Sequence, residues 1–159
     1  EFHCGDVTFF NRMVDSVNKI SFDLFAYTGK LTSKPDETAI AMIYTEIKDN
    51  HHVYITDCCS RVENHGNGKK MFGVLLQYLL IINNMYPITE MCGFLSKYDF
   101  KNWKKLLHFY ESLDEYMSQI NLPVKLNFQL QNYTISELIE NMEQYKDRDI
   151  YFSIFISYN

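Results

Sequence analysis

The sequence predicts a mixed α+β domain in which a mostly antiparallel central sheet is flanked by helices. Several short segments alternate apolar and polar residues, as strands do, and longer segments repeat apolar residues at the spacing of a helix. Polar turns with Gly, Pro, Asp or Asn separate the early strand-like segments, which favours an antiparallel meander. At 159 residues and 47% hydrophobic content, the chain is expected to fold as a single domain over residues 1–159.

The first half of the chain is expected to hold one helix, a meander and a second helix. Residues at three and four residue spacings predict a helix over Val7 to Ile20: Phe9, Phe10, Met13, Val14, Val17 and Ile20. Three strands follow, FDLFAY from Phe22, AIAMIYTEI from Ala39 and HVYITDCC from His52. The apolar run after the glycines then predicts a helix over Lys69 to Asn84.

The second half continues with alternating elements. ITEMCGFL, after Pro87, predicts a strand, and the apolar face of the next segment predicts a helix over Trp103 to Tyr116. VKLNFQLQ alternates cleanly from Val124, Thr134 to Tyr145 is expected to hold a short helix, and IYFSIFIS predicts a closing strand.

Charge and cysteine content narrow the classes of function. A net charge of -5 and a pI near 5.5 argue against a nucleic-acid-binding surface and mildly suit a cationic partner. Four cysteines, Cys4, Cys58, Cys59 and Cys92, show no zinc-site spacing and no dense disulfide framework, which favours a reducing, cytoplasmic setting. No signal peptide is visible, and the longest apolar run, at 71–82, is too short to span a bilayer. Since the chain lacks an initiator Met, we expect either a processed tag remnant or a piece of a longer protein.

The segment RVENHGNGKKM carries the strongest chemical signal. Its Asn-Gly pair could simply form a turn. A strand, a Gly-x-Gly loop and a helix in succession can also bind an anion, because the first turn of a helix presents unpaired N–H groups and a positive dipole end. A Walker A loop is excluded by Glu63 and by Lys70, which stands where Ser or Thr is needed. A dinucleotide fingerprint is excluded because Met71 replaces its third glycine.

ENHGNGKKMFGVLLQYLL resembles the pyrophosphate loop of the GNAT acyltransferases, with Gly66 and Gly68 at the two glycine positions. Downstream, FYESLDEY resembles the Tyr stretch of that family through Tyr110. The chain departs from the family pattern at Glu63, where Gln or Arg is usual, and at Asp114-Glu115, which replaces Gly-Phe. Its N-terminal part looks abbreviated, and the helix between the last two strands looks inserted.

The resemblance implies acetyl-CoA as the cosubstrate, held by a splayed strand and the glycine loop. A main-chain N–H near Cys58 would bond the thioester carbonyl, where charge develops in the transition state. The residues implied are those of the strand end, Thr56, Asp57, Cys58 and Cys59, and those of the loop, Asn64, His65, Gly66, Asn67, Gly68, Lys69 and Lys70.

The resemblance also implies direct transfer of an acetyl group to a primary amine of a small molecule or peptide. Tyr110 is the implied general acid, with a core tyrosine as the alternative. Asp57 and Glu46 are the candidate bases, although a carboxylate on a strand is usually just solvent-facing. A second hypothesis is a degenerate GNAT domain that binds an acyl-CoA or a protein partner without catalysis. A homodimer is also possible.

Three other groups of residues could have either a chemical or a purely structural role. Cys58 and Cys59 lack a recognisable His partner, so we expect one buried and one exposed thiol rather than a nucleophile. The histidines at 51, 52 and 65 are expected on the surface, and no metal site is predicted. Lys101, Lys104 and Lys105 form either a solvated helix face or a contact for the 3'-phosphate of the coenzyme.

Overall fold

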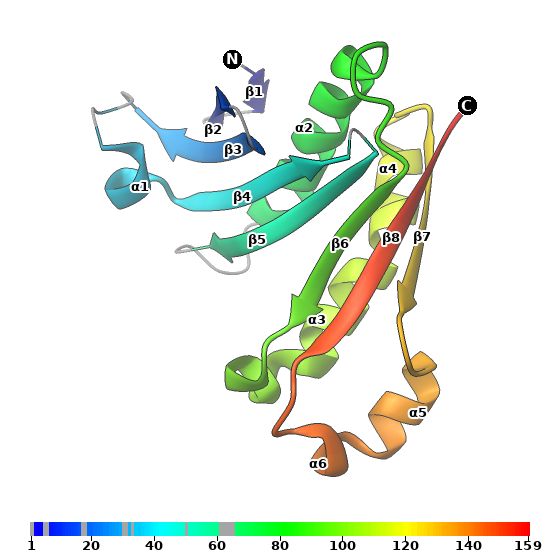
Figure 1. The fold of residues 1–159 in the computed structure, drawn as a ribbon. Coiled ribbons are helices and arrows are strands. Elements are labelled where there is room, and N and C mark those ends of the chain that lie inside the picture. Colours follow the sequence, from blue (N-terminus) through cyan, green and yellow to red (C-terminus); the bar gives the residue numbers. More distant parts are fainter. Residues whose placement is uncertain are drawn as a thin grey trace. The chain divides into compact units, whose positions relative to one another are not determined.

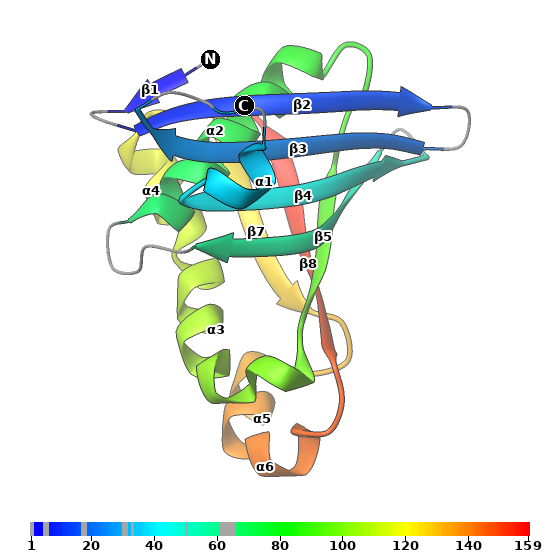
Figure 2. The same ribbon diagram turned by 90° about the vertical axis from the view of Figure 1, so that its left-hand side faces the viewer.

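The computed structural model of the chain describes residues 2–4, 7–16, 19–29, 32, 34–49, 51–60 and 66–159 (Figures 1 and 2). It divides into two compact units, Glu1–Ile88 and Thr89–Asn159. Helices flank strands in both units, and every strand pair described within a unit is antiparallel. The predicted α+β class and the mostly antiparallel pairing are therefore confirmed.

The first unit is a meander whose strands lie side by side in chain order (Figure 2). Its strands are β1 (Phe2–Cys4), β2 (Val7–Ser16), β3 (Lys19–Thr28), β4 (Ala41–Lys48) and β5 (His52–Ser60). The three strands predicted from Phe22, Ala39 and His52 correspond to β3, β4 and β5 and are confirmed. A short helix, α1 (Pro35–Thr38), interrupts the polar segment between β3 and β4.

The helix predicted over Val7 to Ile20 is wrong, because residues 7–16 form β2 and residues 19–20 begin β3, while Val17 lies outside the described residues. β2 pairs with β3 along its whole length, from Val7 opposite Thr28 to Ser16 opposite Lys19. Met13 and Val14 are 41% and 51% exposed, so the apolar stripe that suggested a helix is not a buried face. Tertiary pairing overrides the helical spacing, as is common for segments rich in aromatic and β-branched residues.

The helix predicted over Lys69 to Asn84 is confirmed as α2 (Asn67–Ile82). It lies against β3, β4 and β5, and most of its apolar residues are buried. Phe22 of β3 meets the ring of Tyr78 edge-on, with ring centroids 5.3 Å apart. The fully buried residues of this layer include Leu24, Ile43 and Leu75, so α2 and the sheet form the main core of the first unit.

The second unit is built on the strand order β6-β8-β7. Its strands are β6 (Glu90–Leu95), β7 (Val124–Leu130) and β8 (Ile150–Tyr158), and its helical segments are η1 (Lys97–Asn102), α3 (Trp103–Glu111), α4 (Leu113–Gln119), α5 (Ile135–Glu140) and α6 (Met142–Tyr145). The three strands predicted here are confirmed. α3 and α4 both contact β7 (Figure 1).

Two predicted helices of the second unit are each divided in two. The helix expected over Trp103 to Tyr116 breaks at Ser112, whose N–H is shared between the carbonyls of His108 and Phe109 at 3.1 and 3.2 Å. The short helix near Thr134 begins with a capping box, in which Thr134 and Glu137 bond each other's backbone N–H, both at 3.1 Å. This cap explains why a six-residue helix forms there.

An aromatic cluster fills the core between α3 and the sheet of the second unit. The rings of Tyr110, Phe128 and Phe152 contact one another with centroids 4.6 to 5.4 Å apart. Gly93 of β6 lies directly opposite Phe152 of β8. A Cβ at position 93 would stand 2.6 Å from the Phe152 ring, so glycine is needed here for space.

We therefore expect Gly93→Ala to destabilise the protein by about 1–3 kcal/mol, because the buried Phe152 ring has little room to move. Urea denaturation would measure the change. The matched control is the same substitution in a Phe152→Leu background, where the added methyl group should cost clearly less. Equal costs in the two backgrounds would contradict the explanation.

Candidate functional site

The strand β5 contains one extra residue where it passes Tyr44 and Thr45 of β4. Thr45 is opposite Ile55 and Tyr44 is opposite Asp57, so Thr56 has no opposite residue and forms a bulge. The Thr56 hydroxyl donates a hydrogen bond of 3.1 Å to the carbonyl oxygen of Tyr44, which secures the bulge. The irregularity therefore lies in the segment that the sequence associates with the thioester.

The bulge decides which way Asp57 faces. Regular alternation from Ile55 would turn Asp57 toward the same face as that buried residue. Because of the extra residue, Asp57 shares a face with Tyr44 and hence with Glu46, two positions along β4. The structure thus brings the two candidate bases to one face of the β4–β5 pair. Sequence reasoning missed Tyr44 between them, since a bulge leaves no signal in the apolar pattern.

Glu46 and Asp57 differ in their surroundings. The Glu46 side chain is 23% exposed, and its Oε2 lies 4.0 Å from Nζ of Lys48. Asp57 is exposed, and its Oδ1 accepts a hydrogen bond of 2.8 Å from the backbone N–H of Cys58. The amide near Cys58 that was predicted to meet a thioester carbonyl is therefore bonded to a carboxylate in this structure.

Both thiols at the end of β5 are exposed, so the prediction that one of Cys58 and Cys59 is buried is wrong. They are exposed although they lie opposite Ile43 and Met42 of β4, which are both buried. Although the Cys58 side chain reaches solvent, surrounding protein atoms disfavour its thiolate and raise its pKa to about 12, with smaller contributions from Cys59 and Asp57. This pKa argues against Cys58 as a nucleophile at neutral pH.

The helix α2 begins at the glycine loop. Gly66 is its N-cap residue and has a φ of 69°, a left-handed conformation that favours glycine. A Cβ there would meet nothing within 4 Å, so backbone conformation and not crowding explains the glycine. Asn67 is buried, whereas Gly68, Lys69 and Lys70 are half-buried. The first turn carries no acidic residue, so its N–H groups and positive dipole end suit an anion. Asn64 and His65 lie outside the described residues.

Tyr110 belongs to the second unit and is 9% exposed. Its ring lies nearly parallel to that of Phe128, with centroids 5.4 Å apart, and also contacts Phe152. This packing matches the alternative that the sequence left open, a tyrosine of the core. The role of Tyr110 as an acid stays a prediction. Lys101 of η1 and Lys104 and Lys105 of α3 are exposed.

Both histidines at the β4–β5 turn have a polar contact, and that of His51 joins its Nδ1 to the carbonyl oxygen of Pro87 at 3.3 Å. Nδ1 of His52 lies 2.7 Å from Oδ1 of Asp49, and this hydrogen bond is the main cause that lowers the pKa of Asp49. Among the residues that the structure describes, no group of three or more His, Cys, Asp or Glu side chains could hold a metal ion. In the same part of the chain, no helix is long and apolar enough to cross a membrane.

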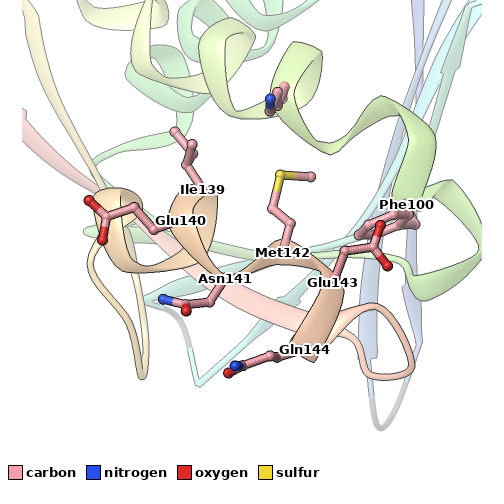
Figure 3. A pocket seen from close by; sticks show the side chains of 8 residues that line it. Phe100, Ile139, Glu140, Asn141, Met142, Glu143 and Gln144 are labelled. Atoms are coloured by element: carbon pink, nitrogen blue, oxygen red, sulfur yellow. The ribbon is translucent and has the colours of Figure 1, made fainter.

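A cavity of about 450 Å³ lies in the second unit between α3 and the α5–α6 segment (Figure 3). Phe100, Ile139 and Met142 contribute apolar walls, and Figure 3 shows Met142 pointing from α6 toward the helix above it. Two of its polar residues are already bonded, Asn141 to the carbonyl of Glu137 and Glu143 to Lys146. Of the residues weighed for acetyl-CoA binding, Lys104 lines this cavity, whereas the candidate bases, Tyr110 and the residues of β5 and the glycine loop are not among its lining residues.

No family model matches the chain, and no curated protein matches it. Among solved structures, it is similar to a protein assigned as a streptothricin acetyltransferase from Bacillus anthracis, crystallised with acetyl coenzyme A, with 15% identity over 89% of this chain and 65% of that one and a TM-score of 0.47. It is also similar to nourseothricin acetyltransferase, with 13% identity over 84% and 64% of the two chains and a TM-score of 0.48. A third similar structure is IAA acetyltransferase from Bacillus cereus, with 12% identity over 84% and 76% and a TM-score of 0.44. The chain thus spans just under two thirds of the length of the first two proteins, at 65% and 64%.

The raised pKa of Cys58 predicts slow alkylation. With a pKa of about 12, only about one thiol in ten thousand is ionised at pH 8, and thiolate is the reactive form. In a Cys59→Ser variant, the rate at which iodoacetamide modifies Cys58, followed by peptide mass spectrometry, should still rise with pH above 10. Cys58→Ser is the matched control, because it measures how fast iodoacetamide modifies the adjacent Cys59. A rate that levels off near pH 9 would contradict the pKa.

Proposed function

We propose that the chain is a GNAT-type N-acetyltransferase that moves the acetyl group of acetyl-CoA to a primary amine of a small molecule or peptide. The observation that carries this proposal is the sequence of features in the first unit: a bulged strand β5 followed by a helix α2 that begins at a left-handed Gly66. The family resemblance of the same residues assigns the bulged strand to the thioester and the helix start to the pyrophosphate.

The N-terminal turn of α2 is the proposed pyrophosphate site. Backbone N–H groups of Asn67, Gly68 and Lys69 are the donors, since the Lys70 N–H already donates to the Gly66 carbonyl oxygen at 3.2 Å, and the positive end of the helix dipole favours the phosphates. The absence of acidic residues in the first turn avoids repulsion there. The half-buried side chains of Lys69 and Lys70 add positive charge close to the same turn.

The end of β5 is the proposed thioester site. When the amine attacks the carbonyl carbon, the carbonyl oxygen gains negative charge, and a backbone N–H near Cys58 would stabilise it. The C–S bond then breaks and the electron pair leaves with sulfur. The thiolate takes a proton from the Tyr110 hydroxyl, and the amine gives up its proton to Glu46 or Asp57, directly or through water. No covalent enzyme intermediate is needed, so both substrates are bound together.

The acceptor is proposed to be a cationic amine. The chain carries a net charge of -5, and both candidate bases lie on one face of the β4–β5 pair, Asp57 exposed and Glu46 partly exposed. Carboxylates on that face would attract an ammonium group and then accept its proton as it reacts. An alkyl ammonium in water has a pKa of about 10.4, so a base near the reacting nitrogen is required.

Calorimetric titration with acetyl-CoA tests the phosphate site. The wild type should bind with a Kd in the micromolar range, and Gly66→Glu should weaken binding by about tenfold or more, because it places a carboxylate beside the phosphates. Gly66→Asn is the matched control, since Asn tolerates the left-handed conformation without adding charge. Equal losses in both variants would mean that backbone strain, and not charge, weakens binding. No binding by any of the three proteins would contradict the proposed function.

Tyr110→Phe tests the proposed acid. It should lower kcat about a hundredfold, the usual lower bound for removing a general acid, while the Kd for acetyl-CoA stays within about twofold. Tyr116→Phe, on the neighbouring helix α4, is the matched control and should leave kcat unchanged. If Tyr110→Phe keeps full activity, Tyr110 is a core residue only, as its packing against Phe128 and Phe152 allows.

A further inference from the structure

We propose that the Asp57 carboxylate occupies the binding position of the thioester oxygen in the free protein and leaves it when acetyl-CoA binds. Asp57 would then be a positioning residue that competes with the substrate, not the general base. This inference rests on the proposed function. It starts from one contact, the 2.8 Å hydrogen bond from the Cys58 N–H to Asp57 Oδ1.

The geometry of the bulge explains why this contact forms. Thr56 is the unpaired residue, and the next residue, Asp57, turns to the face of Tyr44. In that orientation the short Asp57 side chain can accept a hydrogen bond from the N–H of the next residue, Cys58. The longer side chain of a Glu at the same position would do so less readily. Among the described residues no Lys or Arg forms an ion pair with Asp57, so the Cys58 amide is the one polar partner described for it.

The carboxylate resembles the group it would replace. A carboxylate oxygen and the oxygen of a polarised thioester are both negative acceptors that prefer the same N–H direction. One N–H cannot serve both at full strength. A carboxylate that stayed in place would also repel the oxyanion as it forms, since both charges would lie near one donor. Binding of the acetyl group therefore requires the Asp57 side chain to rotate away from Cys58.

This competition separates the two candidate bases. In the free protein Asp57 accepts a hydrogen bond from the Cys58 amide, so its side chain must move before the reaction begins. Glu46 lies on the same face, two positions from Tyr44 along β4, and its side chain is partly shielded, with Lys48 Nζ 4.0 Å from its Oε2. Of the two carboxylates, Glu46 is therefore the one left to accept a proton from the amine.

Two substitutions distinguish a competitor from a base. Asp57→Ala removes the competing oxygen, so the Kd for acetyl-CoA should fall about threefold to tenfold, the effect of one modest hydrogen bond. Asp57→Asn is the matched control, because its amide oxygen still accepts from the Cys58 N–H while the charge is gone. Its Kd for acetyl-CoA should stay within about twofold of the wild-type value.

Calorimetry with free CoA beside acetyl-CoA completes the experiment. Free CoA lacks the thioester oxygen, so Asp57→Ala should bind it with the wild-type Kd. A gain that is equal for CoA and acetyl-CoA, or equal in the Ala and Asn variants, would indicate simple removal of charge and would overturn the inference. So would an unchanged Kd for acetyl-CoA in Asp57→Ala, or a hundredfold loss of kcat in both variants. If neither the wild type nor any variant binds either ligand, the proposed function fails, and the inference with it.

Discussion

The pairing of β4 with β5, broken by one extra residue, is the constraint on which the candidate site depends. Before the bulge the register runs from Lys48 opposite His52 to Thr45 opposite Ile55, and after it Tyr44 faces Asp57. The side-chain period of a strand is two, so a single extra residue exchanges the faces of everything that follows. It decides where Asp57 points and which group lies beside the amide of Cys58.

Much of the fold could be predicted because most of its elements show one clear period. β7 and β8 alternate, α2 has a long apolar stripe, and the capped helix at Thr134 carries its own start signal. β2 could not be predicted in this way because both of its faces have apolar partners. Phe9 is fully buried, while the next residue, Phe10, packs on the ring of Phe25 across the hairpin. Adjacent apolar pairs of this kind imitate helical spacing.

The candidate site was predicted in part. The glycines of the loop predict the start of a helix from residue type alone. In the structure Gly66 has the left-handed conformation that glycine adopts readily. The bulge could not be predicted from the sequence. The Thr, Asp and Cys residues around it have no apolar alternation that a shift in register would interrupt. Tyr110 was ambiguous for another reason: a tyrosine on the apolar face of a helix serves a core and an active site equally well, and only its contacts with Phe128 and Phe152 show the packing.

The departure from the family pattern at Asp114 has a structural counterpart in the second unit. There α4 begins after the break at Ser112, and Oδ1 of Asp114 accepts a hydrogen bond of 2.8 Å from the N–H of Leu126 in β7. β7 is the last strand in the order of its sheet, and a last strand with open donors can recruit a strand from another molecule. The carboxylate occupies one of those donors, so self-association by strand addition at this border would first have to break a charge-assisted bond. The residue that departs from the family pattern thus occupies one backbone donor of the last strand.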